Sequence, residues 1–326
     1  MNLKELILNS RNIKENSLRA YLISLKKLND NKEIESLDYL KDTDSIVEKI
    51  NNFKIALSTK RNYYGAILVA LGTRTDDYDN DKLMLFYKEK LQMINDEYNA
   101  GVNEHRKTKK QEENWATLKE LAVIRNNFKN HIRKEKYRSK TELTYEERNY
   151  LTYYLVVSLY TLIEPIRLDY APMKIIYKIE DDDNETNFLY INSRNSKKFI
   201  LNEYKTSKTY SKVELQIPSE LNSIINLYLK FHKSVYTKND EDNSFIMNFK
   251  NEPLKSTELT MLIPKSFSQY TDKHITLNLL RHIYCTEKIQ LKNPEQLAQE
   301  TQIAKNMCHS LIMQQKYIKI NPHQSS

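Results

Sequence analysis

The segment most informative about the fold class is "NFLYINSRNSKKFILNEYKTSKTYSKVELQIP", residues 187–218. It contains three short runs of strand-forming residues, separated by the turn-like segments "SRNS" and "KTSKTYS". Three consecutive strands joined by short turns predict a small antiparallel sheet. On both sides of this stretch, apolar residues recur with helical spacing instead. The sequence therefore predicts a mostly α-helical protein with one small antiparallel β-sheet.

Helical segments surround the predicted strands. The segment 144–163 opens with Thr144 and Glu147 in capping-box spacing, which marks the start of a helix. The other helices predicted in this part of the chain are 116–132, 219–235, 277–290, 293–307 and 312–320. Together they predict one domain over residues 115–326.

Residues 1–100 show helical periodicity and predict a separate, compact all-α domain. Ser58 is expected to cap one of its helices and to place Lys60 and Arg61 in the first turn. Cations there oppose the helix dipole, so phosphate contact explains them better than a solvated turn does. Residues 101–114 are polar and charged and are predicted to form an exposed linker.

The composition permits a polyanionic partner without requiring one. The 326 residues carry a net charge of +8, while residues 1–100 hold 16 basic and 16 acidic side chains, so the excess lies in 101–326. Glycine is absent after Gly101, which excludes nucleotide-binding glycine loops from the second domain. The two cysteines lack CxxC spacing, and no apolar run has membrane length. We expect an intracellular protein without a cofactor, a metal site or a membrane segment.

Six residues of the second domain could together cleave a phosphodiester without a metal. Such a reaction needs a nucleophile, cations on the non-bridging oxygens and an acid for the leaving hydroxyl. Arginine suits the second task because its fork matches phosphate oxygens in a bidentate way. Each candidate alone has an ordinary structural explanation, so the hypothesis depends on the whole set. In chain order the candidates are Arg167, Lys205, Arg281, His282, His309 and Tyr317.

The order Arg–Lys–Arg–His–His–Tyr resembles that of the tyrosine recombinase (phage integrase) family. "LLRHIYCT", residues 279–286, is similar to the family's LRHS-type helix, and "MCHSLIMQQKYIK", residues 307–319, to its GHS…Y segment. "SLRAYLISLKKL", residues 17–28, resembles part of the helical core-binding domain, which implies a SAM-like, DNA-clamping domain over 1–100. "LIEPIRLDY", residues 162–170, suits a branch found in mobile elements and large DNA viruses.

This resemblance implies a mechanism and partners. Tyr317 would attack a scissile DNA phosphate and form a covalent phosphotyrosyl link, while Arg167 and Arg281 would stabilise the charge on the phosphate. His309 and His282 would assist by hydrogen bonding or proton transfer. The implied partner is double-stranded DNA, clamped by both domains. The implied assembly is a homotetramer on paired sites. The implied location is at DNA, in the nucleus or cytoplasm of a host or in a viral factory.

The fit has open points. Lys205 would protonate the leaving oxygen, but Lys208 lies three residues on and could take its place. Asn278 stands where the family often carries a histidine, three residues before the second arginine. Asparagine can hydrogen-bond a phosphate oxygen but cannot carry a proton at neutral pH. His309 and Tyr317 are eight residues apart, one fewer than a common bacterial spacing, which still brings both into one pocket.

Two other functions fit the same residues. A type IB topoisomerase uses this chemistry to relax DNA and rejoins the original strand. A non-catalytic DNA-binding protein could also use the same fold. The interpretation favoured by the sequence is a site-specific recombinase or integrase, acting in mobile-element or viral genome integration without metal or ATP.

Overall fold

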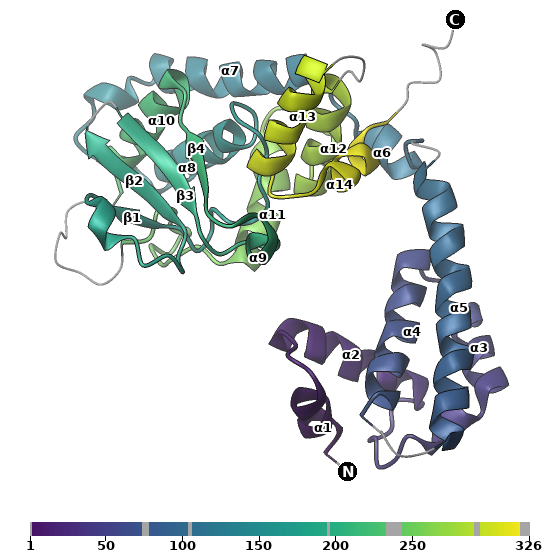
Figure 1. Cartoon of the computed structure of the whole chain (residues 1–326). Coiled ribbons are helices and arrows are strands. Elements are labelled where there is room, and N and C mark those ends of the chain that lie inside the picture. The colour runs from purple at the N-terminus through teal and green to yellow at the C-terminus, as the bar shows by residue number, and fades with distance from the viewer. Residues whose placement is uncertain are drawn as a thin grey trace, which may run out of the picture. The chain divides into compact units, whose positions relative to one another are not determined.

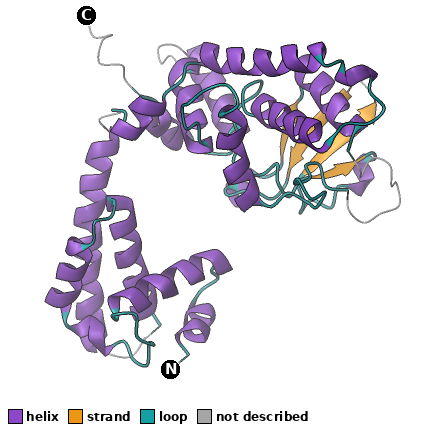
Figure 2. Ribbon diagram, turned by 180° about the vertical axis from the view of Figure 1, so that it is seen from behind, coloured by secondary structure: helices purple, strands orange, loops and turns teal. Residues whose placement is uncertain are grey.

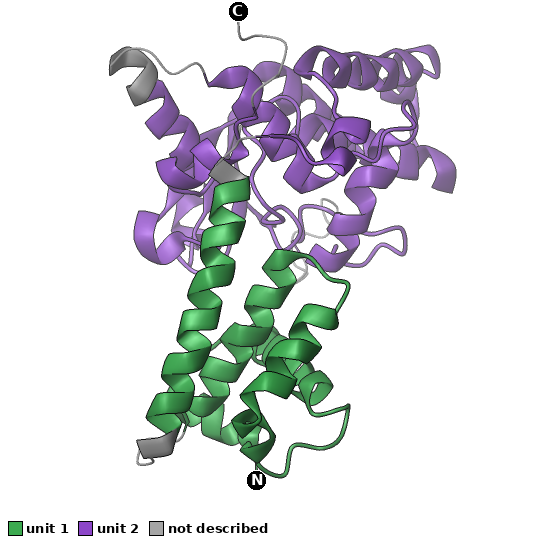
Figure 3. Cartoon of the chain, turned by 90° about the vertical axis from the view of Figure 1, so that its right-hand side faces the viewer, with its two compact units in different colours: residues 1–104 green, residues 105–326 purple. Residues whose placement is uncertain are grey.

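The computed structural model describes residues 2–73, 78–103, 106–193, 196–232, 243–289 and 294–319. The chain forms two compact units, Met1–Glu104 and His105–Ser326 (Figure 3). Helices α5, Tyr78–Asn103, and α6, Lys109–Asn114, occupy much of the segment predicted as an exposed linker, so that segment is largely helical. Within the described ranges no helix has both the length and the apolar character needed to cross a bilayer.

The described residues of the first unit form helices and the loops between them, without strands. Its α4 helix lies at the centre because its apolar residues are distributed around much of the helix, and it packs against α2 and α5 (Figure 1). The predicted Ser58 cap is wrong: Ala56 is the N-cap, and its carbonyl accepts from the Thr59 and Lys60 amides without a side-chain cap. The helices before α5 are α1 Leu3–Ser10, α2 Glu15–Leu28, η1 Asp38–Lys41, α3 Thr43–Asn52 and α4 Leu57–Leu71.

The second unit is built around α8, Tyr145–Leu159, which is buried continuously from Leu151 to its end. The predicted capping box of Thr144 and Glu147 is confirmed, with both reciprocal hydrogen bonds present. Because α8 is apolar around its circumference, other helices enclose it. These and the remaining larger helices are α7 Leu118–Lys134, α10 Ser219–Lys230, α11 Ser256–Phe267, α12 Leu277–Lys288, α13 Pro294–Asn306 and α14 Leu311–Tyr317.

The sheet is small, as predicted, but it is mixed rather than antiparallel (Figure 2). Strands β2 Phe188–Ser193, β3 Ser196–Leu201 and β4 Val213–Gln216 pair antiparallel. A fourth strand, β1 Lys174–Ile176, pairs with β2 in parallel. Three residues are too few to show a strand period, so the sequence pattern missed it. The fold class is therefore mostly α with a small four-stranded sheet.

The connection between β3 and β4 is not a simple turn. It contains a short helix, α9 Ser207–Tyr210, within the predicted turn 205–211. The other predicted turn, 193–196, lies partly outside the described residues. The α9 connection matters because it carries two of the predicted site residues, Lys205 and Lys208.

Candidate active site

Five of the predicted catalytic residues meet in one cluster of the second unit. Arg167 lies in the loop after α8, Arg281 and His282 on α12, His309 between α13 and α14, and Tyr317 at the end of α14. Hydrogen bonds and ring contacts connect them, directly or through the backbone beside His309. The structure thus joins side chains from segments that are far apart in the sequence.

Arg281 is the centre of this cluster and is only 2% exposed. Its guanidinium donates to the carbonyls of Pro165 at 2.6 Å and Met307 at 3.1 Å, and to Nδ1 of His309 at 3.2 Å. The Tyr317 ring centre lies 5.1 Å from its Cζ. All these acceptors are neutral, and no described carboxylate forms a direct ion pair with Arg281, so its charge can act on a bound anion.

Arg167 is half-buried and donates through Nη1 to the carbonyl of Cys308 at 2.8 Å. Burial, followed by the nearby charge of Arg281, lowers the pKa of its guanidinium. Cys308 has φ 53°, in the left-handed region that favours glycine. This turn at the end of α13 gives two successive carbonyls, of Met307 and Cys308, to the two arginines.

His309 is 1% exposed and neutral near neutral pH. Because arginine can only donate, the bond from Arg281 makes Nδ1 of His309 an acceptor and places its proton on Nε2. Burial, and then the charges of Arg281 and Arg167, lower the pKa of His309 to about 3. This imidazole can offer an Nε2–H hydrogen bond but does not carry a transferable extra proton at pH 7.

Tyr317 is held through its backbone. Its carbonyl oxygen accepts from Nδ1 of His282 at 2.9 Å and from Oγ1 of Thr286 at 3.2 Å. Its ring centre lies 4.8 Å from that of His282 and 5.3 Å from that of His309. No described residue forms a hydrogen bond with its hydroxyl, so that oxygen is available as a nucleophile.

His282 makes a backbone contact that the sequence does not predict. Its Nδ1–H donates a hydrogen bond to the Tyr317 carbonyl. Burial lowers its pKa to about 4, so the ring is neutral near pH 7. His282 therefore holds the end of α14 through Nδ1, and its part in the chemistry stays a prediction.

Lys205 and Lys208, the candidate acids, are both exposed on the β3–β4 connection, and neither forms an ion pair with another described residue. Thr206 lies between them and donates through Oγ1 to the Cys308 carbonyl at 2.8 Å. This is the oxygen that Arg167 also binds. The bond ties the residue next to Lys205 to the arginine cluster, whereas Lys208 has no such neighbour.

Besides Lys208, which was also predicted to bind DNA, three predicted DNA-binding residues lie outside the cluster. Asn278 is exposed one helical turn before Arg281 and lines a hollow of about 260 Å³ with neighbours that include His274. Lys60 and Arg61 lie in the first unit and are half-buried. Lys60 donates to a backbone carbonyl at 3.3 Å, and the Arg61 guanidinium lies 4.7 Å from a tyrosine ring centre. Their phosphate contacts stay a prediction.

Buried polar atoms without a well-aligned hydrogen bond mark the cluster and its surroundings. Such atoms are costly in a folded protein and often indicate a functional site. The residues that carry one at this place, within the described part of the chain, are Asp169, Arg281, Glu300, His309 and Gln314. No motif marks Gln314, Thr206 or Thr286, so the sequence did not predict them. The only available signal was that Gln314 lies one helical turn before Tyr317.

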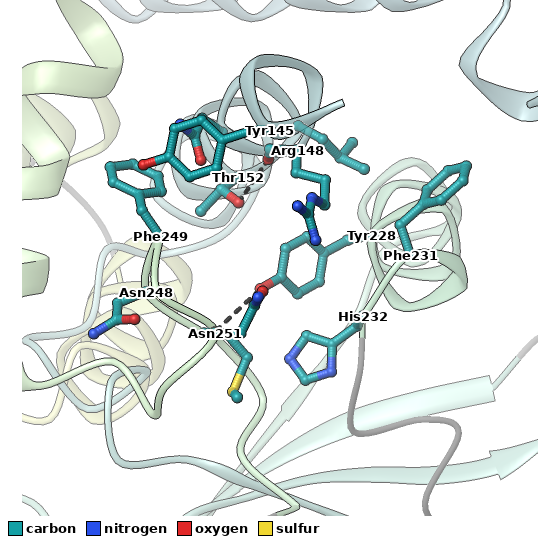
Figure 4. Close-up of a pocket in the computed structure, with 12 residues that line it drawn as sticks. Tyr145, Arg148, Thr152, Tyr228, Phe231, His232, Asn248, Phe249 and Asn251 are labelled. Carbon is teal, nitrogen blue, oxygen red and sulfur yellow. Dashed lines mark hydrogen bonds between the residues drawn. The ribbon is translucent and has the colours of Figure 1, made fainter. Parts of the chain in front are cut away.

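A second hollow is lined by α8, α10 and the chain after residue 243, and Figure 4 shows it close up. Its volume is about 40 Å³, far below that of typical ligand pockets. The Tyr228 hydroxyl accepts from the Met247 amide at 3.1 Å, and none of the predicted site residues lines it. In the described ranges no three His, Cys, Asp or Glu side chains gather as metal ligands.

Comparisons with known proteins add little to this site. No model of a known protein family matches the chain, and no curated protein matches it. Among solved structures, the chain is similar to the crystal structure of XerA recombinase, with a TM-score of 0.38 and 12% identity over 98% of this chain and 92% of that one. So loose a superposition says nothing about individual residues, and the candidate site therefore depends only on the contacts described above.

Proposed function

We propose that this protein is a DNA strand transferase of the tyrosine recombinase type. The observation that carries the proposal is the convergence of two arginines, a neutral histidine and a tyrosine with an uncommitted hydroxyl. A phenol has a pKa of about 10 and is a poor nucleophile near pH 7. Cations beside the reacting phosphate stabilise the developing charge and make such a phenol useful.

In the proposed reaction, the Tyr317 oxygen forms a bond to the scissile phosphorus and its proton passes to water. The bond from phosphorus to the leaving deoxyribose oxygen breaks, and Lys205 donates a proton to that oxygen. Arg167 and Arg281 bind the non-bridging oxygens, and His309 donates its Nε2–H to one of them. The phosphotyrosyl ester retains the bond energy, so religation to another strand needs no ATP.

The proposed partner is double-stranded DNA, contacted by both units. The positive charge in residues 101–326, together with Lys60 and Arg61, supports it. Exchange between two duplexes cuts four strands, and each cut needs one Tyr317, so we propose a homotetramer on paired sites. Integration of a mobile element or viral genome is the proposed setting.

A plasmid assay tests this proposal against its rivals. Sites are first recovered by selecting bound fragments from a random DNA library, and supercoiled plasmids with and without paired sites are then incubated with the protein. A recombinase exchanges strands only where sites are paired, a topoisomerase relaxes every plasmid, and a binding protein leaves DNA intact. Peptide mapping after trapping on a nicked suicide substrate should place the adduct on Tyr317; an adduct elsewhere refutes the site.

A further inference from the structure

Gln314 lies on α14, five residues after His309, and its side chain is buried, with 1% of the residue exposed. Its Nε2 donates to the backbone carbonyl of Glu300 at 3.1 Å. Because that carbonyl can only accept, the bond fixes which end of the amide is nitrogen. The amide oxygen Oε1 therefore lies at the other end, where it is buried and has no well-aligned partner.

His309 presents the complementary group. Arg281 binds its Nδ1, so Nε2 carries the proton, and this nitrogen is also buried without a well-aligned partner. Gln314 lies close enough to the ring to oppose part of the pKa depression that burial causes. A bond between the two would pair an N–H donor with a carbonyl acceptor. Leaving both unpaired in the interior would be costly.

We propose that Gln314 is a positioning residue: its Oε1 accepts the Nε2–H of His309 in the resting protein and keeps the ring in that tautomer and orientation. This first half of the inference concerns the chain alone. The second half depends on the proposed function: when DNA binds, the same Nε2–H turns to a non-bridging phosphate oxygen, and Gln314 releases it. A neutral amide suits this exchange because its oxygen accepts the hydrogen bond without removing the proton from the imidazole.

The surroundings of His309 define what a change at Gln314 does. An amide keeps the ring neutral beside two cations, whereas a carboxylate at the same place would stabilise the imidazolium. The charged or titratable groups of the elements packed around the ring include Arg281 and His282 on α12, Arg167 and Asp169 after α8, Glu300 on α13, Cys308 beside the ring, and Tyr317 on α14.

The test compares Gln314→Met and Gln314→Glu with the same changes at Gln315, which is exposed on the same helix. Nitrogen-15 NMR of the full chain without DNA should show His309 as the Nε2–H tautomer, uncharged above pH 5. We expect Gln314→Met to speed solvent exchange of this proton at least tenfold. Gln314→Glu keeps the shape of the side chain, so it serves as the test if the apolar variant does not fold. We expect it to raise the pKa of His309 by at least one unit. Gln314 variants that behave like the Gln315 controls overturn the proposal.

A second readout separates this inference from the proposed function. Covalent adduct formation on DNA should slow about tenfold in Gln314→Met at unchanged DNA affinity, and Gln314→Glu should lose rate as the pH falls below its raised His309 pKa. Should the wild type form no adduct while the NMR differences appear, the proposed function fails and the positioning role stands. An unchanged adduct rate in both Gln314 variants refutes the DNA-dependent half.

Discussion

Arg167 and Arg281 are held by consecutive backbone carbonyls, those of Cys308 and Met307, at 2.8 and 3.1 Å. One left-handed turn after α13 therefore sets the spacing of both guanidiniums. The turn also lies at the carboxyl end of a helix, where the partial negative charge favours cations. Two positive side chains are thus kept side by side before any phosphate is present.

Arg281→Lys should abolish most cleavage while sparing DNA binding. Lysine keeps the charge but lacks the planar fork that serves Pro165, Met307 and His309 together. We expect adduct formation to fall at least about 100-fold, with DNA affinity changed less than about threefold. Arg133→Lys, an exposed site on α7, is the control. An equal loss of binding and cleavage would show that Arg281 is structural.

Tyr317→Phe should fold normally and form no covalent complex. The hydroxyl of Tyr317 has no partner among the described residues, so its loss should change the unfolding free energy by less than about 0.5 kcal/mol. Tyr160→Phe is the matched control, because the Tyr160 hydroxyl donates to the Arg167 carbonyl at 2.9 Å. That variant should lose about 1 kcal/mol and still form the adduct.

Urea unfolding and denaturing gels on trapped DNA measure both effects. Chelators should leave the wild-type adduct unaffected if the arginines supply the charge. Adducts that persist in Tyr317→Phe, or activity lost to a chelator, would transfer the assignment to another tyrosine or to a metal nuclease.

The left-handed turn should make glycine better than alanine at position 308. Cys308→Gly should be about 1 kcal/mol more stable than Cys308→Ala, because a Cβ in this conformation costs that much. Cys285 is equally buried but lies inside α12, so there the order should reverse by about 1 kcal/mol. Urea unfolding of the four variants measures both differences. Alanine favoured at both positions would contradict the left-handed turn.

Lys205, and not Lys208, should act as the acid. Lys205→Ala should slow cleavage of an ordinary phosphodiester by about 100-fold, within the usual range for general acids. On a substrate with sulfur as the leaving bridging atom, the loss should largely disappear, because a thiolate leaves without a proton. Lys208→Ala serves as the matched control and should be close to wild type on both substrates. The reverse pattern would assign the role to Lys208.

The protein should lose stability as the pH falls below about 6.5. The pKa values of His309 and His282, about 3 and about 4 in the folded chain, lie below the ordinary value of about 6.5 in the unfolded chain. The unfolded chain therefore binds more protons in this window, so stability is full above it and falls on acidification. At pH 5 each ring should account for about 2 kcal/mol of loss.

Urea unfolding at pH 7.5 and 5.0 tests this with His309→Gln and His282→Asn. Each variant should show a smaller difference between the two pH values than the wild type. Buried Asp169 and Glu300 act in the opposite direction, because burial raises their pKa, and comparison with the wild type cancels their part. The same pH dependence in all three proteins would contradict neutral, buried imidazoles.

Features that depend on local periodicity could be predicted from the sequence alone. Helical spacing and the strand runs of 187–218 predicted a mostly α chain with a small sheet, and the capping box at Thr144 was correct in detail. The candidate residues were also local signals, because Arg281 and His282, or His309 and Tyr317, stand in short recognisable segments. Strand β1 was missed because three residues do not make a period.

The contacts among the candidate residues could be found only from the folded chain. Arg167 meets the Cys308 carbonyl across 141 positions of the chain, and Arg281 meets His309 across 28. Those contacts set the tautomer of His309, connect His282 to the Tyr317 carbonyl and tie Thr206 to the site. No local pattern encodes them, because hydrogen-bond pairing and desolvation depend on which distant segments pack together. The sequence therefore indicates which groups are present, and their packing determines which atoms carry the protons.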